Sequence, residues 1–294
     1  MAAMSPRPHI LVVNGRKVSN PVFVLGGPHS GTELIARALK RTAGLHVTIG
    51  QPALANVVYA LARSPSIQRG RAEATATVLR DALAQAWRLT PDACLACLPA
   101  CRQAQPAGAI TCAGERPVER YGDASPELIY CAEALVAAFP DARLVQVVRD
   151  GRAVVAAMLA DPIELAWLRS GVANVDSEFP NPFYGIETEP DRAAWAGLSA
   201  AGRCAMRWRG SLHEMARLRR RLDGERLTTF RYEQIVAEPT RAALALAEFI
   251  GTPVEGLEMP GEAPDGWRAA LAQAQLTEIE KVAGPQLRRV GYAD

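Results

Sequence analysis

The sequence contains no run of about 18 consecutive apolar residues, so no transmembrane helix is expected. Its first residues lack a cationic stretch followed by an apolar core, and a secretory signal peptide is not expected either. The formal net charge over 294 residues is only +2, which argues against general binding to nucleic acids. We therefore expect a cytoplasmic protein that neither spans a membrane nor binds nucleic acid.

Internal repeats and linker-like stretches are also missing, so the chain is expected to fold as one domain over residues 1–294. Hydrophobic residues make up 49% of the chain and charged residues 22%, which is ordinary for a globular protein with a substantial core. The frequent use of Ala and Arg is typical of a GC-rich bacterial genome.

The pattern between residues 21 and 39 predicts a phosphate-binding loop. Four apolar residues, Val22 to Leu25, predict a buried strand, and residues 32–39 have the spacing of an amphipathic helix. Between them lies the turn Gly26-Gly27-Pro28-His29-Ser30-Gly31-Thr32. Backbone N–H groups converge in such a turn, and the N-terminus of the helix adds a partial positive charge. Both features attract a phosphate.

The loop departs from the Walker A motif at one position. Gly26 and Gly31 are five positions apart, as in that motif, but Thr32 stands where the motif requires lysine. We therefore expect a loop that holds a phosphate without serving ordinary ATP hydrolysis.

Strand and helix patterns alternate along the rest of the chain. A hairpin is predicted around Asn14-Gly15, at residues 9–19. Helices are predicted at 52–62, 70–89, 126–138, 151–159, 191–222, 240–250 and 267–282, and further strands at 144–148 and 227–230. Residues 90–120 are predicted to form an irregular insertion or lid, and residues 160–190 a long loop. The alternation predicts an α/β fold, with a central, mostly parallel sheet flanked by helices.

Four segments together resemble the sulfotransferases that use 3′-phosphoadenosine 5′-phosphosulfate (PAPS). The Pro-x-Ser-Gly-Thr turn at 28–32 is similar to their 5′-phosphosulfate loop, and Arg149-Asp150-Gly151-Arg152 is similar to their 3′-phosphate element. Two further segments, RYEQIVAEP at 231–239 and LRRVGY at 287–292, also resemble family segments. The resemblance implies a P-loop NTPase-like sulfotransferase fold that takes a sulfuryl group from PAPS and releases 3′-phosphoadenosine 5′-phosphate (PAP).

The resemblance also implies which residues bind the donor nucleotide. The 5′-phosphosulfate would lie against Gly27, Pro28, His29, Ser30, Gly31 and Thr32. Arg149 follows a predicted strand, at the edge where open α/β sheets bind ligands, and its guanidinium suits bidentate contact with the 3′-phosphate. Arg152 and Tyr232 are the other nucleotide-binding candidates. Two alternatives stay open, namely that Arg152 faces the helix exterior and that Tyr232 is a core residue.

Sulfuryl transfer needs a group that assists the departure of PAP and a base that deprotonates the acceptor. His29 stands where the family usually has Arg or Lys, and a protonated His29 would neutralise the bridging oxygen. Gln51 occupies the position of a glutamate base in protein-tyrosine sulfotransferases, and glutamine accepts no proton at neutral pH. Glu33, His46 and Asp123 are therefore the candidates for the base.

A group of cysteines has three possible interpretations. Cys94, Cys97, Cys101 and Cys112 form the pattern C-x2-C-x3-C-x10-C. This spacing fits a zinc site, two disulfides, or simple packing of small residues. The resemblance implies no requirement for a metal.

The sequence leaves the acceptor open, as a hydroxyl or amine on a small molecule, a glycan or a lipid. Gln51 and Ala157, which replaces a family serine at the 3′-phosphate element, favour an alternative: a catalytically silent nucleotide-binding protein. A P-loop kinase that uses ATP is a second alternative. The missing Walker A lysine argues against it, as does the lack of an obvious Mg²⁺-binding aspartate at a strand end.

Overall fold

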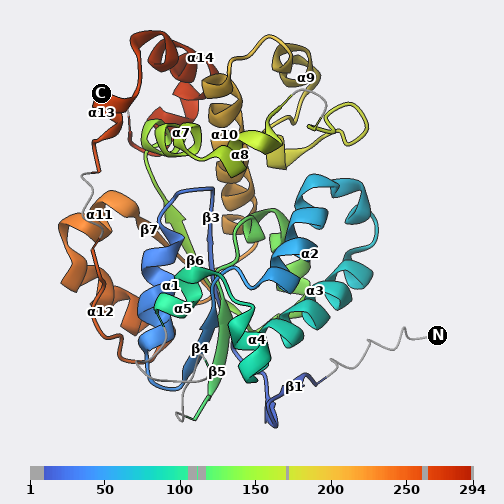
Figure 1. The fold of residues 1–294 in the computed structure, drawn as a ribbon, viewed down its shortest axis with the longest axis vertical. Coiled ribbons are helices and arrows are strands. Elements are labelled where there is room, and N and C mark those ends of the chain that lie inside the picture. Colours follow the sequence, from blue (N-terminus) through green and yellow to red (C-terminus); the bar gives the residue numbers. More distant parts are fainter. Residues whose placement is uncertain (1–9, 105–110, 112–116, 170–171, 260–263, 293–294) are drawn as a thin grey trace.

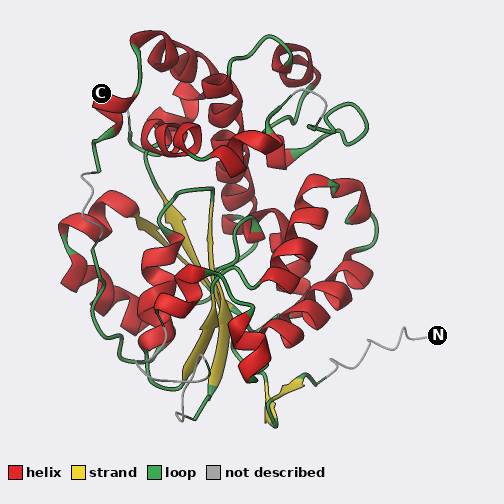
Figure 2. Ribbon diagram, viewed as in Figure 1, coloured by secondary structure: helices red, strands yellow, loops and turns green. Residues whose placement is uncertain are grey.

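The structure is a computed structural model and describes residues 10–104, 111, 117–169, 172–259 and 264–292. Within these residues, five parallel strands form the central sheet in the spatial order β4-β5-β3-β6-β7 (Figures 1 and 2). Their bounds are β3 Val22–Gly26, β4 Leu45–Thr48, β5 Arg120–Asp123, β6 Arg143–Val148 and β7 Leu227–Arg231. The predicted α/β fold with a parallel central sheet is confirmed.

The central strand β3 is buried on both faces. Val22 and Val24 pack into one hydrophobic core, whereas Phe23 and Leu25 pack into the other. Successive side chains of a strand point to opposite faces, so a strand covered on both sides appears in the sequence as an unbroken apolar run. This arrangement explains the pattern of residues 22–25.

Helices cover both faces of the sheet (Figure 2). One core includes residues of α1 Thr32–Arg41, α4 Pro91–Leu95, α5 Pro99–Gln103, α11 Tyr232–Ala237 and α12 Pro239–Ile250. The other includes residues of α2 Pro52–Arg63, α3 Ala72–Ala86, α6 Ala132–Ala138, α7 Gly151–Ala160, α10 Ala200–Arg219 and α14 Gln273–Arg289. Short 3₁₀ turns occur at Pro65–Ile67, Leu128–Cys131 and Pro182–Tyr184.

A helical layer lies beyond the carboxyl ends of the strands. It contains α8 Pro162–Trp167, α9 Glu189–Trp195 and α13 Trp267–Ala270, together with α7 and α14 (Figure 1). The long helix α10 connects this layer to the side of the sheet. Among the helices in the described part of the chain, none has the length and hydropathy needed to span a membrane.

The predicted hairpin is confirmed. The strands β1 Val12–Val13 and β2 Arg16–Lys17 pair in antiparallel fashion. Asn14 and Gly15 connect them with positive φ angles of 49° and 75°. Such angles are typical of a two-residue hairpin turn, for which Asn-Gly is the preferred sequence.

The sheet contains two strands that the sequence pattern does not predict, β4 and β5. β5 lies at the end of the segment predicted to be irregular, and its Gly122 pairs with Val22 of the central strand. A Cβ added at Gly122 would lie 2.6 Å from the carbonyl oxygen of Val22. A short strand that needs glycine at this contact and has charged residues at both ends shows little hydrophobic alternation. The segment 90–120, predicted to be an irregular insertion or lid, contains the short helices α4 and α5 and ends where β5 begins. Its role as an insertion or lid stays a prediction.

Several predicted helix bounds were wrong. The helix expected over 191–222 is two helices, α9 and α10, and the hydroxyl of Ser199 accepts a hydrogen bond from the amide of Gly202 at the start of α10. The loop expected over 160–190 contains α8, which Asp161 caps. The final helix is divided into α13 and α14. Local capping residues set these boundaries, and the apolar periodicity alone does not reveal them.

Three of the patterned cysteines lie in the core beside α1. Cys94, Cys97 and Cys101 are buried among apolar side chains, and Nζ of Lys40 donates a hydrogen bond to Sγ of Cys101 at 3.1 Å. Cys112 lies outside the described residues. The burial of these three side chains agrees with the packing interpretation.

Candidate active site

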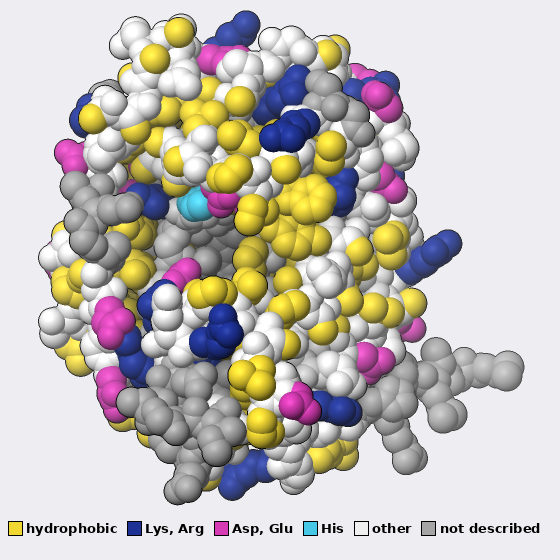
Figure 3. Space-filling model, in the orientation of Figure 1, with side chains coloured by type: hydrophobic (Ala, Val, Ile, Leu, Met, Phe, Trp, Pro, Cys, Tyr) yellow, Lys and Arg dark blue, Asp and Glu magenta, His cyan; other side chains and the backbone are white. Residues whose placement is uncertain are grey.

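A cavity of about 590 Å³ opens at the carboxyl ends of the central strands. Its walls come from the turn after β3, the start of α1, the turn after β5, the residue after β6, α8 and the residue after β7. In Figure 3 this face of the molecule is hollowed beside a histidine and an acidic side chain. Open parallel sheets bind ligands at this edge, where loops from neighbouring strands meet.

A second cavity, of about 630 Å³, lies along α12. Its lining residues are apolar or small, and none of them is ionisable. The cavity at the sheet edge combines backbone amides, arginines and carboxylates, so it is the candidate active site.

The predicted phosphate loop forms one end of the cavity. Five of its six predicted residues line the cavity, namely Gly27, Pro28, His29, Gly31 and Thr32. The sixth, Ser30, is buried and does not line the cavity, and among the described residues its Oγ atom has no hydrogen-bond partner. The loop ends at the N-terminus of α1, and the backbone N–H groups at such a helix start fit a phosphate group.

Two residues of this loop adopt a left-handed backbone conformation. His29 has a φ of 52° and Gly31 has a φ of 92°. A Cβ at Gly31 would lie only 2.3 Å from Cδ2 of Tyr232. Glycine is therefore required at position 31 both by its φ angle and by the ring that packs against it.

Arg149 lies directly after β6, at the cavity wall, as the sequence predicts. Its Nη1 donates a hydrogen bond to the backbone oxygen of His29 at 3.1 Å, and its guanidinium carbon lies 4.2 Å from the centre of the Tyr232 ring. Its Nε is buried and has no hydrogen-bond partner in the part of the chain that the structure describes. The guanidinium is thus held beside the loop with a donor available for an anion. Tyr232 lines the same wall and positions Arg149.

Arg152 is placed away from the cavity wall. Its Nη2 lies 2.8 Å from Oδ2 of Asp150 and donates to the backbone oxygen of Tyr292 at 2.8 Å. Its guanidinium also packs over Trp267, 4.2 Å from the ring centre. These contacts hold the start of α7 against the C-terminal segment and agree with the alternative that Arg152 faces the helix exterior. Its assignment to the nucleotide stays a prediction.

The three predicted bases occupy different environments. Glu33 lines the cavity, but its side chain is 47% exposed and its Oε1 accepts a hydrogen bond from Nε of Arg37 at 2.7 Å. His46 is buried within β4, does not line the cavity, and neither of its ring nitrogens has a hydrogen-bond partner. Burial and the neighbouring Lys40 charge lower the pKa of His46 from 6.5 to about 3. His46 is therefore a neutral core residue.

Asp123 is fully buried and does not line the cavity. Its Oδ2 accepts a hydrogen bond from Oγ1 of Thr48 at 2.5 Å, and its Oδ1 accepts one from the backbone N–H of Ser125 at 2.6 Å. Burial raises the pKa of Asp123 to about 7, against the lowering effect of these bonds. Both oxygens are engaged, so the geometry assigns Asp123 to fixing the turn after β5.

Gln51 also has a structural task. Its Oε1 accepts a hydrogen bond from the backbone N–H of Leu54 at 3.1 Å, which caps the N-terminus of α2. The capping bond gives the glutamine a structural role beside the start of α2. The silent alternative stays a prediction.

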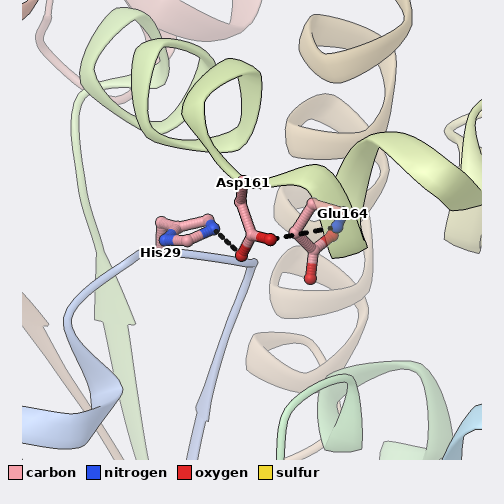
Figure 4. A group of neighbouring side chains, drawn as sticks. All are labelled: His29, Asp161 and Glu164. Atoms are coloured by element: carbon pink, nitrogen blue, oxygen red, sulfur yellow. Dashed lines mark hydrogen bonds and ion pairs between the residues drawn. The ribbon is translucent and has the colours of Figure 1, made fainter.

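The sequence interpretation missed the carboxylates on α8. Nε2 of His29 lies 3.3 Å from Oδ2 of Asp161 (Figure 4). The other oxygen of Asp161 caps α8 by accepting hydrogen bonds from the backbone amides of Ile163, at 2.9 Å, and Glu164, at 3.3 Å. The Asp-Pro pair at positions 161–162 is a recognisable cap signal, but nothing in the sequence indicates that the cap faces His29.

His29, Asp161 and Glu164 each offer one metal-ligand atom, and these atoms lie within 4.8 Å of one another. Both carboxylates, however, already have protein partners. Asp161 caps α8, and Glu164 forms an ion pair with the buried guanidinium of Arg207. In the described contacts, Asp161 therefore holds His29 and Glu164 holds Arg207.

Another carboxylate, that of Glu127, lies in the turn after β5 and lines the cavity. Its Oε1 lies 2.5 Å from Nη2 of Arg207, on α10. Arg207 thus contacts both glutamates, although Glu127 lies 80 positions and Glu164 lies 43 positions before it in the sequence. The sequence interpretation missed this cluster because its members share no motif.

Comparison with known proteins identifies the family to which the chain belongs. A family model described as the sulfotransferase family matches residues 21–179, which is more than half of the chain. The chain therefore belongs to the sulfotransferase family, and membership implies a transferase whose donor is PAPS. A comparison with curated proteins gave no match.

Similar solved structures include three bacterial proteins. A sulfotransferase from Alicyclobacillus acidocaldarius is 15% identical, with 93% of this chain and 95% of that chain covered and a TM-score of 0.49. The sulfotransferase domain of the Synechococcus PCC 7002 olefin synthase is 16% identical, with 93% and 98% covered and a TM-score of 0.47. A sulfotransferase from Mycobacterium avium is 14% identical, with 94% and 78% covered and a TM-score of 0.46.

Proposed function

We propose that the chain transfers the sulfuryl group of PAPS to a hydroxyl or amine of a small-molecule, glycan or lipid acceptor. The observation that supports this most directly is the position of Arg149. Its guanidinium lies beside the phosphate loop, packed on Tyr232, and its buried Nε has no partner among the described residues. A donor nucleotide with phosphate groups at both the 5′ and 3′ positions needs two anion sites, and the proposal assigns the 5′ group to the loop and the 3′ group to Arg149.

The loop after β3 would hold the 5′-phosphosulfate through its backbone N–H groups and Ser30 Oγ. His29 lies within this loop and is oriented by Asp161 at 3.3 Å. In the proposed mechanism, His29 donates a hydrogen bond or a proton to the oxygen that becomes part of PAP, so that negative charge developing there is neutralised. Arg149, packed on Tyr232, would bind the 3′-phosphate and so orient the nucleotide relative to the loop.

The acceptor side of the cavity is formed by the turn after β5 and by α8. Ser125, Pro126, Glu127, Asp161 and Glu164 all line it. The geometry supports a proton-accepting group on this side without selecting one acceptor class. No metal is part of the proposal, because the carboxylates near His29 are engaged by the helix cap and by Arg207.

Calorimetric titration tests the nucleotide assignment. We expect the protein to bind PAP and to bind ADP much more weakly, because ADP lacks the 3′-phosphate that Arg149 would contact. Equal affinity for the two nucleotides would favour the P-loop kinase alternative instead. Tight binding of PAP without turnover of PAPS, over a panel of phenols, alcohols and amines, would favour the silent nucleotide-binding alternative.

A further inference from the structure

We propose that Glu127, held by Arg207, is the group that accepts the proton of the acceptor during sulfuryl transfer. This inference rests on the proposed function. It assigns the base to a residue other than Glu33, which pairs with Arg37, and other than His46 and Asp123, which do not line the cavity. It is carried by the position of Glu127 in the cavity wall, by its backbone conformation and by the charge of the cluster to which it belongs.

Glu127 lies in the cavity wall on the acceptor side, directly after the turn that Asp123 fixes. Only 2% of the residue is exposed. Its φ of 68° is left-handed, a conformation that residues other than glycine rarely adopt. Such backbone outliers concentrate at functional sites, where the surrounding structure fixes one side chain in a required position.

The two carboxylate oxygens of Glu127 have different environments. Oε1 is bound by Nη2 of Arg207, whereas Oε2 is buried and has no hydrogen-bond partner among the described residues. Arg207 is itself fully buried and packs over Phe183, 4.1 Å from the ring centre. One oxygen therefore anchors the side chain while the other is left for a ligand, as a proton acceptor requires.

The charge balance of the cluster favours uptake of one proton. Two buried carboxylates, Glu127 and Glu164, share the single positive charge of Arg207. The cluster carries one net negative charge when both carboxylates are ionised, and it becomes neutral when one of them is protonated. Burial disfavours the charged state, so the cluster gains stability from accepting a proton.

The direction of the Glu127 pKa shift agrees with this balance. Burial and the negative charge of Glu164 raise the pKa of Glu127, the Arg207 charge lowers it, and the resulting pKa is about 7. A carboxylate in this range is partly ionised at neutral pH and is a far stronger base than an exposed glutamate.

Other buried titratable groups face the cluster. Tyr59 on α2, Tyr130 and Cys131 in the 3₁₀ turn, and Cys204 on α10 have pKa values that burial raises far above neutrality. These tyrosines and cysteines therefore stay protonated while Glu127 titrates. Glu214 on α10, which acts on Tyr130 and Cys131, pairs with Arg217, and burial raises its pKa to about 7. Asp161, at the start of α8, is held by its cap and by His29.

In the proposed step, Oε2 of Glu127 accepts the proton of the acceptor O–H or N–H. The acceptor atom uses the released electron pair to form a bond to sulfur, while the bond between sulfur and the bridging oxygen of PAPS breaks. PAP leaves with the electron pair of the broken sulfur–oxygen bond on its oxygen, and Glu127 later returns its proton to solvent. No oxidant, reductant or metal is needed.

The first test is Glu127→Gln, which keeps the volume and a carbonyl oxygen for Arg207 but accepts no proton. The matched control is Glu133→Gln, on the exposed side of α6, where the glutamate pairs with Arg221. With aliphatic alcohols as acceptors and PAPS as donor, Glu127→Gln is expected to lower kcat by about 10²–10⁴-fold. With 4-nitrophenol, which ionises readily by itself, the loss is expected to be much smaller. PAP affinity is expected to stay unchanged.

The second test is Glu164→Gln, which removes the negative charge beside Glu127 but leaves the Glu127–Arg207 ion pair. The measurement is the pH dependence of kcat/KM, which rises as the proposed base, Glu127, loses its proton. The rising limb near pH 7 is expected to move to lower pH in Glu164→Gln and to stay in place in Glu133→Gln.

Unchanged transfer to aliphatic alcohols in a folded Glu127→Gln variant would overturn the assignment, as would an unmoved limb in Glu164→Gln. In both cases the wild-type enzyme still transfers the sulfuryl group, so the proposed function stands and only the base is reassigned. A wild-type protein that transfers nothing from PAPS would overturn the proposed function itself.

Discussion

Nε2 of His29 lies 3.3 Å from Oδ2 of Asp161, a contact that joins the phosphate loop after β3 to the N-terminus of α8. Asp161 therefore performs two tasks at once, since its other oxygen caps the helix. The contact fixes the imidazole at the end of the cavity where the 5′-phosphosulfate is proposed to lie. It also makes the orientation of His29 depend on the position of α8.

We predict that His29→Ala lowers kcat by about 10²–10⁴-fold, the usual contribution of general acid catalysis, with little change in PAP affinity. Asp161→Asn is expected to lower kcat less, because the amide still caps α8 and still contacts the imidazole. Asp81→Asn, on the exposed surface of α3, is the matched control. Full turnover in His29→Ala would show that PAP departs without help from this residue.

Arg149→Ala is expected to weaken PAP binding by about 1.5–3 kcal/mol, which is typical of a charge-assisted hydrogen bond. A nucleotide without the 3′-phosphate should lose little affinity, because Arg149 is assigned to that group alone. The control is Arg241→Ala, whose side chain is 82% exposed on α12. Titration calorimetry measures all three proteins, and an unchanged PAP affinity in Arg149→Ala would remove the 3′-phosphate assignment.

Gly31→Val is expected to abolish donor binding and to lower the midpoint of thermal unfolding. The sequence suggests that a side chain here would fill the phosphate space, whereas the structure shows that its Cβ would first collide with Tyr232, 2.3 Å away. Removing the ring in a Gly31→Val/Tyr232→Ala double variant should not restore binding, because the φ of 92° still disfavours valine. Normal PAP affinity in Gly31→Val would show that the loop is only a structural turn.

His46→Phe is expected to preserve kcat and to make stability less sensitive to acid. The folded pKa of about 3 lies below the ordinary value of 6.5, so the folded state binds fewer protons than the unfolded chain in this range. The contribution of His46 to stability is therefore fully present above pH 6.5 and is lost as the pH falls below it. Thermal unfolding between pH 7 and pH 4 should show a flatter decline in His46→Phe. A large loss of kcat would restore His46 as a catalytic candidate.

The parts of the site that could be predicted from the sequence are those held by contiguous residues. The phosphate loop lies within a few positions after a buried strand, so its glycines, strand and helix appear together in the sequence. Arg149 is recognisable for the same reason, because it directly follows the apolar run of β6. Because these residues are adjacent in the sequence, the local strand, turn and helix largely determine where their side chains lie.

The cluster around Arg207 could not be predicted in this way. Glu127 and Glu164 reach Arg207 from separate turns and helices, and only tertiary packing brings the three together. The left-handed backbone of Glu127 is likewise set by its surroundings, since its sequence neighbours give no glycine-like signal. The strands β4 and β5 were missed for a related reason. Each has only four residues, and their pairing depends on the central strand.

The most direct test of the account is turnover of PAPS carrying a labelled sulfuryl group, with a panel of phenols, aliphatic alcohols and amines. Mass spectrometry would follow both PAP and the acceptor. We predict that PAP and one labelled, sulfated acceptor form in equal amounts with the wild-type protein, and that Arg149→Ala and Glu127→Gln slow both. Binding of PAP without any labelled product from any acceptor would contradict the account, because the cavity would then hold a nucleotide without transferring its sulfuryl group.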